Sequence, residues 1–358
     1  MIRNTATHAL RSPLPGSFYR DAAMLDQLRE RVFLPSWQWA FGPEGLPAPG
    51  HVRPFNLLPG FLDEPLLATA SEQGEPLILA NVCTHRGNLL TRAAGPCRHL
   101  VCPYHGRRFS LDGTCITQPG LGAVPDFPGE EDHLRRPAQA TWAGFHFVRM
   151  QDGPGFDSWI HPLRQRIDFL PLHALTHDPD RSMTYTVKAN WALYCENYLE
   201  GLHIPFVHPA LRDALDLTAY PVITDGQTVL QTGLAREGEP AFDLPPDHPD
   251  FGQRIYAWYY WLFPNLMINV YPWGLSVNVV EPVGVAETRV RFLTYRFAGQ
   301  SGGPDTHALH DTELEDESVV ETVQQGVRSS LYTPGRMVPG WEDGVVWFHQ
   351  LLCQHLTR

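Results

Sequence analysis

Two short segments of this chain each combine a cysteine with a histidine. One residue separates Cys83 from His85, two residues separate Cys102 from His105, and sixteen residues lie between the two pairs. Thiolate and imidazole groups are ligands of transition metals. Two of each match a [2Fe–2S] cluster in which one iron is held by cysteines and the other by histidines. The spacing therefore predicts an iron–sulfur cluster bound by these four residues.

The residues around the two pairs suit tight loops that approach a cluster closely. Gly87 and Gly106 follow the pairs, and glycine lets the backbone turn where a side chain would interfere. Pro103 stiffens the second loop. Structural zinc is an alternative, because cysteine and histidine pairs also bind that ion. Zinc fingers, however, usually group Cys with Cys and His with His, whereas each pair here contains one of each.

A second candidate metal site lies in residues 190–209, which contain His203 and His208. On a straight helix these residues would point about 140° apart, a poor geometry for one ion. Pro205 lies between them and is expected to break the helix, so that the two rings converge. Two imidazoles, one carboxylate and open positions form the facial triad that holds non-haem Fe(II). Two ordinary histidines near a helix end are the alternative, since histidine has many roles.

The carboxylate of such a triad must come from a distant segment, and Asp316 is the candidate. Within about 60° of it on a helical wheel lie Leu309, Val320, Val323, Val327 and Leu331. An unpaired carboxylate in an apolar stripe is costly, and a bound metal would remove that cost. Glu315 and Glu317 are expected to face solvent, and Glu342 and Asp343 are alternative ligands. A position near a helix N-terminus, where acids are favoured, would also explain Asp316.

Glu200 precedes His203 by three residues and is expected on the same face of the helix. There it would lie beside the iron without binding it. A carboxylate at this place could accept a hydrogen bond from a histidine of another cluster and pass electrons or protons between the two centres. The simpler alternative is an acid that only supports the metal ligands, which is common around metal sites.

The size and composition of the chain suit two domains that hold these two sites. The chain has 358 residues, of which 43% are hydrophobic and 18% charged, so it is expected to be globular. Its net charge of −12 argues against nucleic acid and anionic membranes as partners. Six cysteines do not suggest a secreted disulfide framework, and free thiolate ligands favour a cytoplasmic location. No signal peptide or membrane-spanning segment is expected.

Periodicity and turn signals divide the chain further. Residues 21–34 have helical spacing and end before Pro35. A region of short strands and turns follows, which predicts a small antiparallel β-domain over about residues 41–150. Its expected strands are 65–70, 76–80 and 141–148. Beyond this domain the expected elements are a helix at 163–172, a strand at 181–189 and buried strands within 255–280.

Residues 83–105, 190–209 and 315–336 together resemble the α-subunit of Rieske non-haem iron oxygenases, and the resemblance covers nearly the whole chain. High-potential Rieske proteins add a cysteine to each cluster loop, whereas Asn88 and Tyr104 stand here, which favours the lower-potential, oxygenase-type cluster. The resemblance implies an α+β fold. An all-β Rieske [2Fe–2S] domain, residues 41–150, would be inserted in a catalytic domain of residues 1–40 and 151–358, whose antiparallel sheet is covered by helices.

The resemblance also implies roles for the candidate residues. The [2Fe–2S] cluster would be held by Cys83, His85, Cys102 and His105, and the mononuclear Fe(II) by His203, His208 and Asp316. Glu200 matches the acid that links a cluster histidine of one subunit to an iron ligand of its neighbour, which implies a head-to-tail homotrimer. A flavin-containing reductase would supply electrons from NAD(P)H, and O2 would be the co-substrate.

Residues 264–273 and 323–327 look like the choline monooxygenase and betaine-demethylase branch, which oxidises a carbon attached to a quaternary ammonium group. Aromatic rings could bind such a cation through their faces, although alternating aromatics on strands are commonly core. The candidates are Tyr256, Trp258, Tyr259, Tyr260, Trp261, Phe263, Tyr271 and Trp273. The prediction is a terminal oxygenase that hydroxylates or N-demethylates a betaine-, choline- or carnitine-like amine. Alternatives are an aromatic-ring-hydroxylating oxygenase and a Rieske electron-transfer protein without oxygenase activity.

Overall fold

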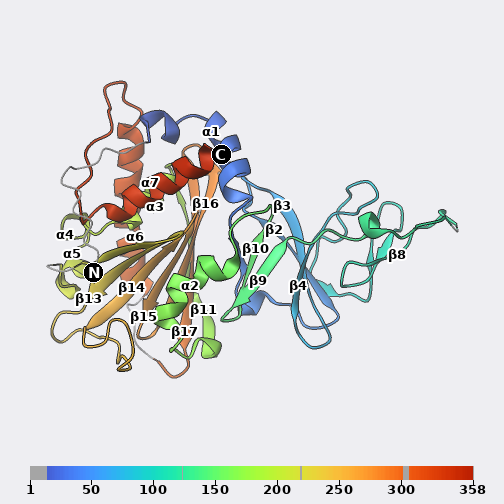
Figure 1. Ribbon diagram of the computed structural model, residues 1–358, viewed down its shortest axis with the longest axis horizontal. Coiled ribbons are helices and arrows are strands. Elements are labelled where there is room, and N and C mark those ends of the chain that lie inside the picture. The colour runs from blue at the N-terminus through green and yellow to red at the C-terminus, as the bar shows by residue number, and fades with distance from the viewer. Residues whose placement is uncertain (1–13, 123, 218–219, 301–305, 358) are drawn as a thin grey trace. The chain divides into compact units, whose positions relative to one another are not determined.

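The computed structural model describes residues 14–122, 124–217, 220–300 and 306–357. The chain divides into two compact units. Residues 38–152 form the smaller unit, and the segments before and after them, up to residue 37 and from residue 153 on, form the larger one. The smaller unit is therefore an insertion in the sequence of the larger one (Figure 1).

The smaller unit consists of antiparallel strands arranged in three sheets. Their strand orders are β1-β10-β9, β4-β3-β2-β5 and β6-β7-β8. The longer strands are β1 (Gln38–Phe41), β2 (His51–Leu57), β3 (Glu64–Ala70), β4 (Pro76–Ala80), β9 (Ala138–Trp142) and β10 (Phe145–Arg149). The shorter ones are β5 (Gly95–Pro96), β6 (Leu100–Val101), β7 (Arg108–Phe109) and β8 (Cys115–Thr117), and two single turns of 3-10 helix span Pro43–Gly45 and Glu130–Asp132.

Of the strands expected in this unit, one pair is confirmed and one single strand is wrong. The expected pair at 65–70 and 76–80 is confirmed, because β3 and β4 pair with Leu67 opposite Leu79. A single closing strand at 141–148 is wrong, since the segment turns back on itself as the hairpin β9–β10. Ala143 and Gly144 have φ angles of 51° and 80°. Positive φ at both central residues is what a tight two-residue hairpin requires.

The β9–β10 hairpin buries a histidine that stays uncharged in the folded protein. His146 is 3% exposed and lies opposite Thr141, whose Oγ1 is 3.1 Å from the histidine Nδ1. Burial, helped by the positive charge of Arg53, lowers the pKa of His146 from 6.5 to about 4. Between these two pH values the unfolded chain binds a proton that the folded protein does not. The stability contributed by neutral His146 is therefore lost as the pH falls through this window.

Replacing His146 by phenylalanine should reduce this acid sensitivity. The free energy of unfolding of the wild type is expected to fall by up to about 3 kcal/mol more than that of His146→Phe between neutral pH and about pH 4. Urea denaturation at several pH values measures the difference. His161→Phe, at an exposed position of the larger unit, is the control and should follow the wild type. Equal acid sensitivity of His146→Phe and the wild type would contradict the prediction.

The larger unit is built on one antiparallel sheet of seven strands in the order β11-β17-β16-β15-β14-β13-β12. The strands are β11 (Leu175–Val187), β12 (Val222–Asp225), β13 (Thr228–Leu234), β14 (Ile255–Leu262), β15 (Leu266–Tyr271), β16 (Gly274–Gly284) and β17 (Glu287–Phe297). The expected buried strands within 255–280 are thus confirmed as β14, β15 and most of β16. The strand expected at 181–189 is the second half of β11.

Helices pack against both faces of this sheet (Figure 1). On one side, α2 (Phe156–Ile167) contacts β14, where the Tyr260 hydroxyl bonds the carbonyl of Pro162. On the other side lie α3 (Trp191–Tyr198), α6 (Thr306–Gly326) and α7 (Asp343–Leu356), and Tyr198 of α3 bonds Asn269 of β15. The remaining helices are α1 (Ala23–Leu28), α4 (Ile204–Val207), α5 (Pro209–Ala214), a π-helical turn at Arg29–Phe33, and 3-10 turns at Gly16–Tyr19 and Leu172–Ala174.

Two helix expectations can be compared with these elements. The helix at 21–34 is confirmed as α1 and the π-helical turn that continues it to Phe33. The helix expected at 163–172 instead spans Phe156–Ile167, because Pro162 lies inside α2 and not before it.

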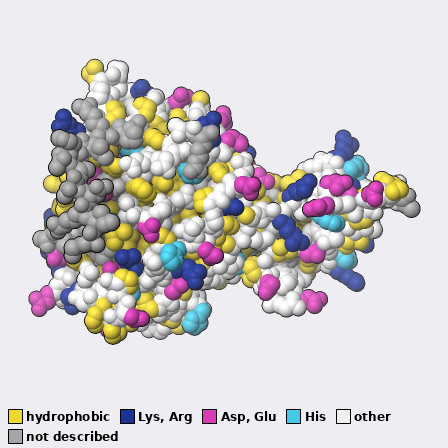
Figure 2. All heavy atoms as spheres, viewed as in Figure 1, with side chains coloured by type: hydrophobic (Ala, Val, Ile, Leu, Met, Phe, Trp, Pro, Cys, Tyr) yellow, Lys and Arg dark blue, Asp and Glu magenta, His cyan; other side chains and the backbone are white. Residues whose placement is uncertain are grey.

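The fold class is α+β, as expected, with an all-β unit inserted in a unit of sheet and helices. None of the described helices is both long and apolar enough to cross a membrane. On the face drawn in Figure 2, the described basic side chains lie among acidic ones and do not gather in one patch.

Candidate active site

Two loops of the smaller unit have the same backbone hydrogen bonds. In the first, the N–H of Gly87 donates to the carbonyl of Cys83 at 2.9 Å. In the second, the N–H of Gly106 donates to the carbonyl of Cys102, also at 2.9 Å. The two glycines have φ angles of 72° and 74°, which favour glycine over other residues. Equivalent turns therefore present the two Cys–His pairs.

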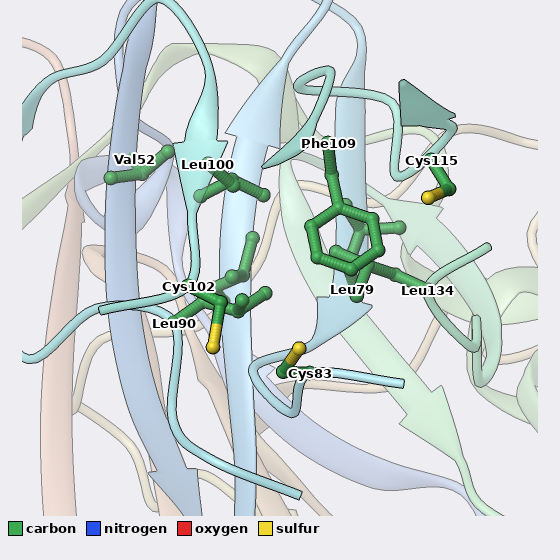
Figure 3. Packing of buried hydrophobic residues seen from close by; sticks show 10 residues of the cluster. Val52, Leu79, Cys83, Leu90, Leu100, Cys102, Phe109, Cys115 and Leu134 are labelled. Atoms are coloured by element: carbon green, nitrogen blue, oxygen red, sulfur yellow. The ribbon is translucent and has the colours of Figure 1, made fainter. Parts of the chain in front are cut away.

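The four side chains of these loops form a set of two inner thiols and two outer rings. Cys83 and Cys102 are each 2% exposed, and their sulfur atoms lie on the same side of the hydrophobic cluster (Figure 3). The rings of His85 and His105 lie 4.8 Å apart between centroids. Nδ1 of His105 is buried and has no hydrogen-bond partner among the described residues. Two thiols, two imidazoles and an unpaired ring nitrogen fit a [2Fe–2S] cluster.

Hydrogen bonds from the loop backbone favour the charged form of the Cys102 thiol. Burial acts against ionisation of Cys102, but backbone N–H groups of Tyr104 and His105 outweigh it and lower its pKa. Burial raises the pKa of Cys83, to which the neighbouring thiol of Cys102 also contributes. All six cysteines are free thiols. Figure 3 shows Cys115 on the opposite side of Phe109 from the sulfur atoms of Cys83 and Cys102.

A buried arginine, which sequence reasoning missed, connects the two loops. Arg107 follows the second Cys–His pair, and its Nη1 lies 2.9 Å from Asp132 Oδ1 and 3.0 Å from Thr84 Oγ1. Thr84 lies between the cysteine and histidine of the first pair. The hydrogen bond from Arg107 to Thr84 thus joins the two loops without a metal.

In the larger unit, His203 and His208 lie at the two ends of the short helix α4. Their rings are 5.1 Å apart between centroids, at an angle of 80°. The chain is already non-helical between α3 and α4, and Pro205 lies in the first turn of α4, where proline is tolerated. The rings converge as expected, but the break precedes the proline.

Asp316 of α6 completes a compact group with these two histidines. Its Oδ1 lies 3.0 Å from Nε2 of His208 and 3.8 Å from Nε2 of His203. One ligand atom from each residue lies within 4.8 Å of the other two. Two imidazoles and a carboxylate are the donor set of the non-haem Fe(II) facial triad, and the arrangement fits one ion.

The apolar stripe that pointed to Asp316 is narrower than the helical wheel suggests. Val320 and Val327 are buried, but Val323 is 42% exposed. Leu331 is 89% exposed because α6 ends at Gly326, so the wheel does not extend to it. The side chain of Leu309 lies outside the described residues.

Each of the three residues in the group is held by a second polar side chain. Nδ1 of His203 lies 2.6 Å from Glu200 Oε1, and Nδ1 of His208 lies 2.8 Å from Glu315 Oε2. Asn197 donates from Nδ2 to Asp316 Oδ1 at 2.6 Å. Such contacts fix the orientation of metal-binding side chains, and here they turn both Nε2 atoms toward Oδ1 of Asp316.

Hydrogen bonding also changes the proton affinity of one ring. Burial alone would lower the pKa of His208, but its bonds to Asp316 and Glu315 outweigh burial and raise it.

The sequence expectations about the neighbouring acids are met only in part. The side chain of Glu315 is 40% exposed, as expected, but it also bonds His208, and Oε1 of Glu317 is buried. Glu200 lies in the turn between α3 and α4, not on a helix face, yet still reaches His203. Its Oε2 also accepts from the backbone N–H groups of Leu202 and His203.

The alternative ligands Glu342 and Asp343 are engaged elsewhere. They accept hydrogen bonds from the backbone N–H groups of Val338 and Gly340, respectively, in the turn before α7. Neither belongs to the group of His203, His208 and Asp316.

A cavity of about 270 Å³ opens beside this group. Its floor is a polar row across five strands, in which each residue is the cross-strand partner of the next. The row is Gln231, Tyr259, Asn269, Ser276 and Thr294. Side chains of cross-strand partners point to the same face of a sheet, so register places all five under the cavity.

The aromatic candidates divide between the cavity and the core. Tyr256, Tyr259, Tyr271 and Trp273 line the cavity. Trp258, Tyr260, Trp261 and Phe263 are fully buried core residues. Alternation separates Tyr259 from Trp258 and Tyr260, but Trp261 shares the face of Tyr259 and packs against Phe348 of α7 instead. Tyr198 and Tyr220 add further rings from outside these strands.

The cavity wall also contains an acid that sequence reasoning missed. Glu313 of α6 is 5% exposed, and the hydroxyl of Tyr194 donates to its Oε1 at 2.7 Å. Burial, together with the negative charge of Asp316, raises the pKa of Glu313 well above its ordinary value. The signal was its place three residues before Asp316 on the same helix.

An all-β unit with paired cysteines and histidines, and a sheet-and-helix unit with two histidines and an aspartate beside a cavity, define a two-centre iron oxygenase. The chain belongs to the family described as ring hydroxylating alpha subunit (catalytic domain), whose model matches residues 172–358. The model of the Rieske [2Fe-2S] domain matches residues 38–128. The resemblance seen in the sequence is thereby confirmed.

Curated relatives agree with this family assignment. The carnitine monooxygenase oxygenase subunit of Acinetobacter pittii (strain PHEA-2) is 27% identical, and the match covers 95% of this chain and 94% of that protein. The chloroplastic choline monooxygenase of Arabidopsis thaliana is 27% identical, with 96% and 82% covered.

Two solved structures share the fold. The quaternary ammonium Rieske monooxygenase CntA in complex with L-carnitine has a TM-score of 0.75 and 23% identity, covering 97% of this chain and 96% of that chain. Naphthalene 1,2-dioxygenase from Rhodococcus sp. bound to indole has a TM-score of 0.72 and 18% identity, covering 96% and 94%.

The chain is therefore an oxygenase α-subunit of a multicomponent system, with a [2Fe–2S] cluster and a non-haem iron as cofactors and with electrons delivered by a reductase. Structural zinc in the cysteine–histidine loops and a pure electron carrier are not supported.

Proposed function

We propose that this protein is the terminal oxygenase that hydroxylates or N-demethylates a small betaine-, choline- or carnitine-like quaternary amine. The observation that carries the proposal is the cavity, where ring faces and carboxylates surround a space beside the candidate iron ligands. Ring faces and negative charge both attract a quaternary ammonium group. Similarity to carnitine and choline monooxygenases supports the same substrate class.

We assign the [2Fe–2S] cluster to Cys83, His85, Cys102 and His105, and the mononuclear iron to His203, His208 and Asp316. When bound, these cofactors supply electrons and the activation of O2. The chain positions the reacting parts. Glu200 and Glu315 hold the two imidazoles through Nδ1, and the polar floor and the rings line the space for the substrate.

For the assembly, we propose a head-to-tail homotrimer in which Glu200 bridges a cluster histidine of one subunit and an iron ligand of the next. We further propose a flavin-containing reductase that uses NAD(P)H, and work in the cytoplasm, where free thiols persist. Residues 41–150 would act as the Rieske domain, and residues 1–40 and 151–358 as the catalytic domain.

Hydroxylation of an aromatic ring is the second candidate. The cavity's many aromatic side chains also suit a flat apolar substrate. The shared fold with naphthalene 1,2-dioxygenase is compatible with it.

A substrate panel distinguishes the two candidates. Purified protein with a surrogate reductase and NADH would receive choline, glycine betaine, L-carnitine, naphthalene or indole, and oxygen uptake and product would be measured by electrode and mass spectrometry. We expect a hydroxylated or demethylated product from at least one quaternary amine and none from the rings. Product from rings alone would overturn the proposed substrate class. Product analysis is essential because a substrate analogue can stimulate oxygen uptake without being oxidised.

A further inference from the structure

Glu313 is a buried acid in the wall of the cavity, and the family's metal sites do not account for it. It lies on α6 one turn before Asp316. Among the described residues, its one side-chain hydrogen bond comes from the hydroxyl of Tyr194, which donates to Oε1. The second carboxylate oxygen, Oε2, therefore has no hydrogen-bond donor in the described part of the chain.

In the described part of the chain, Glu313 also has no ion-pair partner. Within the described ranges, none of the ion pairs at 4.0 Å or less includes its carboxylate. Arg181 is the one arginine or lysine in the described lining of the cavity, and its Nε lies 3.8 Å from Asp178 of its own strand. A buried carboxylate normally pairs with a cation or a metal, because an isolated buried charge is costly. Its position here points to a cation that arrives with the ligand.

We propose that Glu313 supplies the negative charge that binds the ammonium group of the substrate. The proposal rests on the proposed quaternary-amine function and deepens it, because it names a residue that selects cationic over neutral substrates. A quaternary ammonium has no N–H to donate, so charge and ring faces recognise it. Tyr194 and Tyr185 line the cavity beside this carboxyl. A cation bound there favours the ionised form of the acid.

The place of Glu313 on α6 also suits the reaction. Residues three apart on a helix lie on the same face, so a cation held by Glu313 brings its methyl groups toward Asp316 and the two histidines. An uncharged aromatic substrate would gain no binding energy from the charge of Glu313. It would also leave the buried carboxylate without a cation. Glu313 therefore favours the first candidate function over the second.

Glu313→Gln tests the proposal, because it keeps the shape and the acceptor for Tyr194 while removing the charge. The probes are choline, glycine betaine and L-carnitine, each paired with the uncharged isostere in which C(CH3)3 replaces N(CH3)3. Isothermal titration calorimetry measures Kd on the full-length protein without turnover. We expect the Kd of the cations to rise by about 30-fold or more, as for loss of one member of a buried charge pair, and the Kd of the isosteres to stay unchanged.

Two further variants complete the test. Glu317→Gln makes the same change one turn further along α6, at a residue outside the cavity lining, and should bind all probes like the wild type. Glu313→Asp keeps the charge and should still prefer cations to isosteres. Unchanged visible absorption of the cluster and an unchanged circular dichroism spectrum would show that each variant is folded.

Three outcomes would overturn the proposal in distinguishable ways. Wild-type affinity of Glu313→Gln for the cations would refute the role of Glu313 and leave the proposed function intact. An equal rise in the Kd of Glu313→Gln for cations and for isosteres would show that the side chain has only a structural role. A wild-type protein that binds none of the cations would refute the quaternary-amine function together with this inference.

Discussion

Replacing Asp316 by alanine is expected to remove the mononuclear iron and abolish product formation, while the [2Fe–2S] cluster remains. Asp316 Oδ1 is the atom on which Nε2 of His203 and of His208 converge, and without it two imidazoles remain to hold the ion. The carboxylate and the cluster ligands belong to different compact units. The cluster's visible absorption should therefore be unaffected by the substitution.

Iron analysis and oxygen uptake measure this effect together. Iron content should fall from about three to about two atoms per chain, and substrate-dependent oxygen uptake should become undetectable. Glu317→Ala, on the same helix but outside the triad, is the matched control and should keep its iron. If Asp316→Ala retained both iron and activity, the ligand would have to be another acid.

Replacing Glu200 by glutamine is expected to separate electron delivery from iron binding. Glutamine keeps one oxygen that can accept from Nδ1 of His203, although it offers no second acceptor to the backbone N–H groups of Leu202 and His203. Because the contact that orients His203 is kept, the ion should remain bound. Without the carboxylate charge, transfer between the cluster of one subunit and the iron of the next should be slow. We expect product formation to fall roughly 100-fold, a typical scale for loss of a group that supports a metal ligand.

Single-turnover measurements distinguish this role from simple positioning. With the cluster reduced beforehand, its reoxidation in the presence of O2 and substrate should slow in Glu200→Gln, while iron content stays constant. Glu315→Gln is the matched control, since Glu315 makes the equivalent contact with Nδ1 of His208, and it should reoxidise at the wild-type rate. Similar losses in both variants would show that Glu200 only orients its histidine.

The candidate ligands were accessible to sequence reasoning because local spacing encodes them. Cys83 with His85, and Cys102 with His105, each lie on one turn, and the glycine that follows each pair closes that turn with the same hydrogen bond. The strands at 65–70 and 76–80 were predictable for a similar reason, since alternation and turn residues act over a few positions. Helix ends were harder, as Pro162 inside α2 illustrates.

The neighbours of the metal ligands were not accessible in this way. Glu315 seemed to face solvent on a helical wheel, but the ring of His208, from 107 residues earlier in the chain, packs against it. Asn197 and Arg107 likewise bond to partners from other segments. A wheel describes one helix alone and carries no information about what packs on it.

By itself, the amino-acid sequence predicted two metal-binding constellations, because ligand spacing and turn residues are local properties, and its resemblance to a known family implied the α+β fold. Only the tertiary structure decided which rings face the cavity, which acids hold the histidines, and that Glu313 lies buried in the cavity wall. Those features depend on strand register and helix packing between distant segments. There a shift of one residue turns a side chain from the cavity into the core.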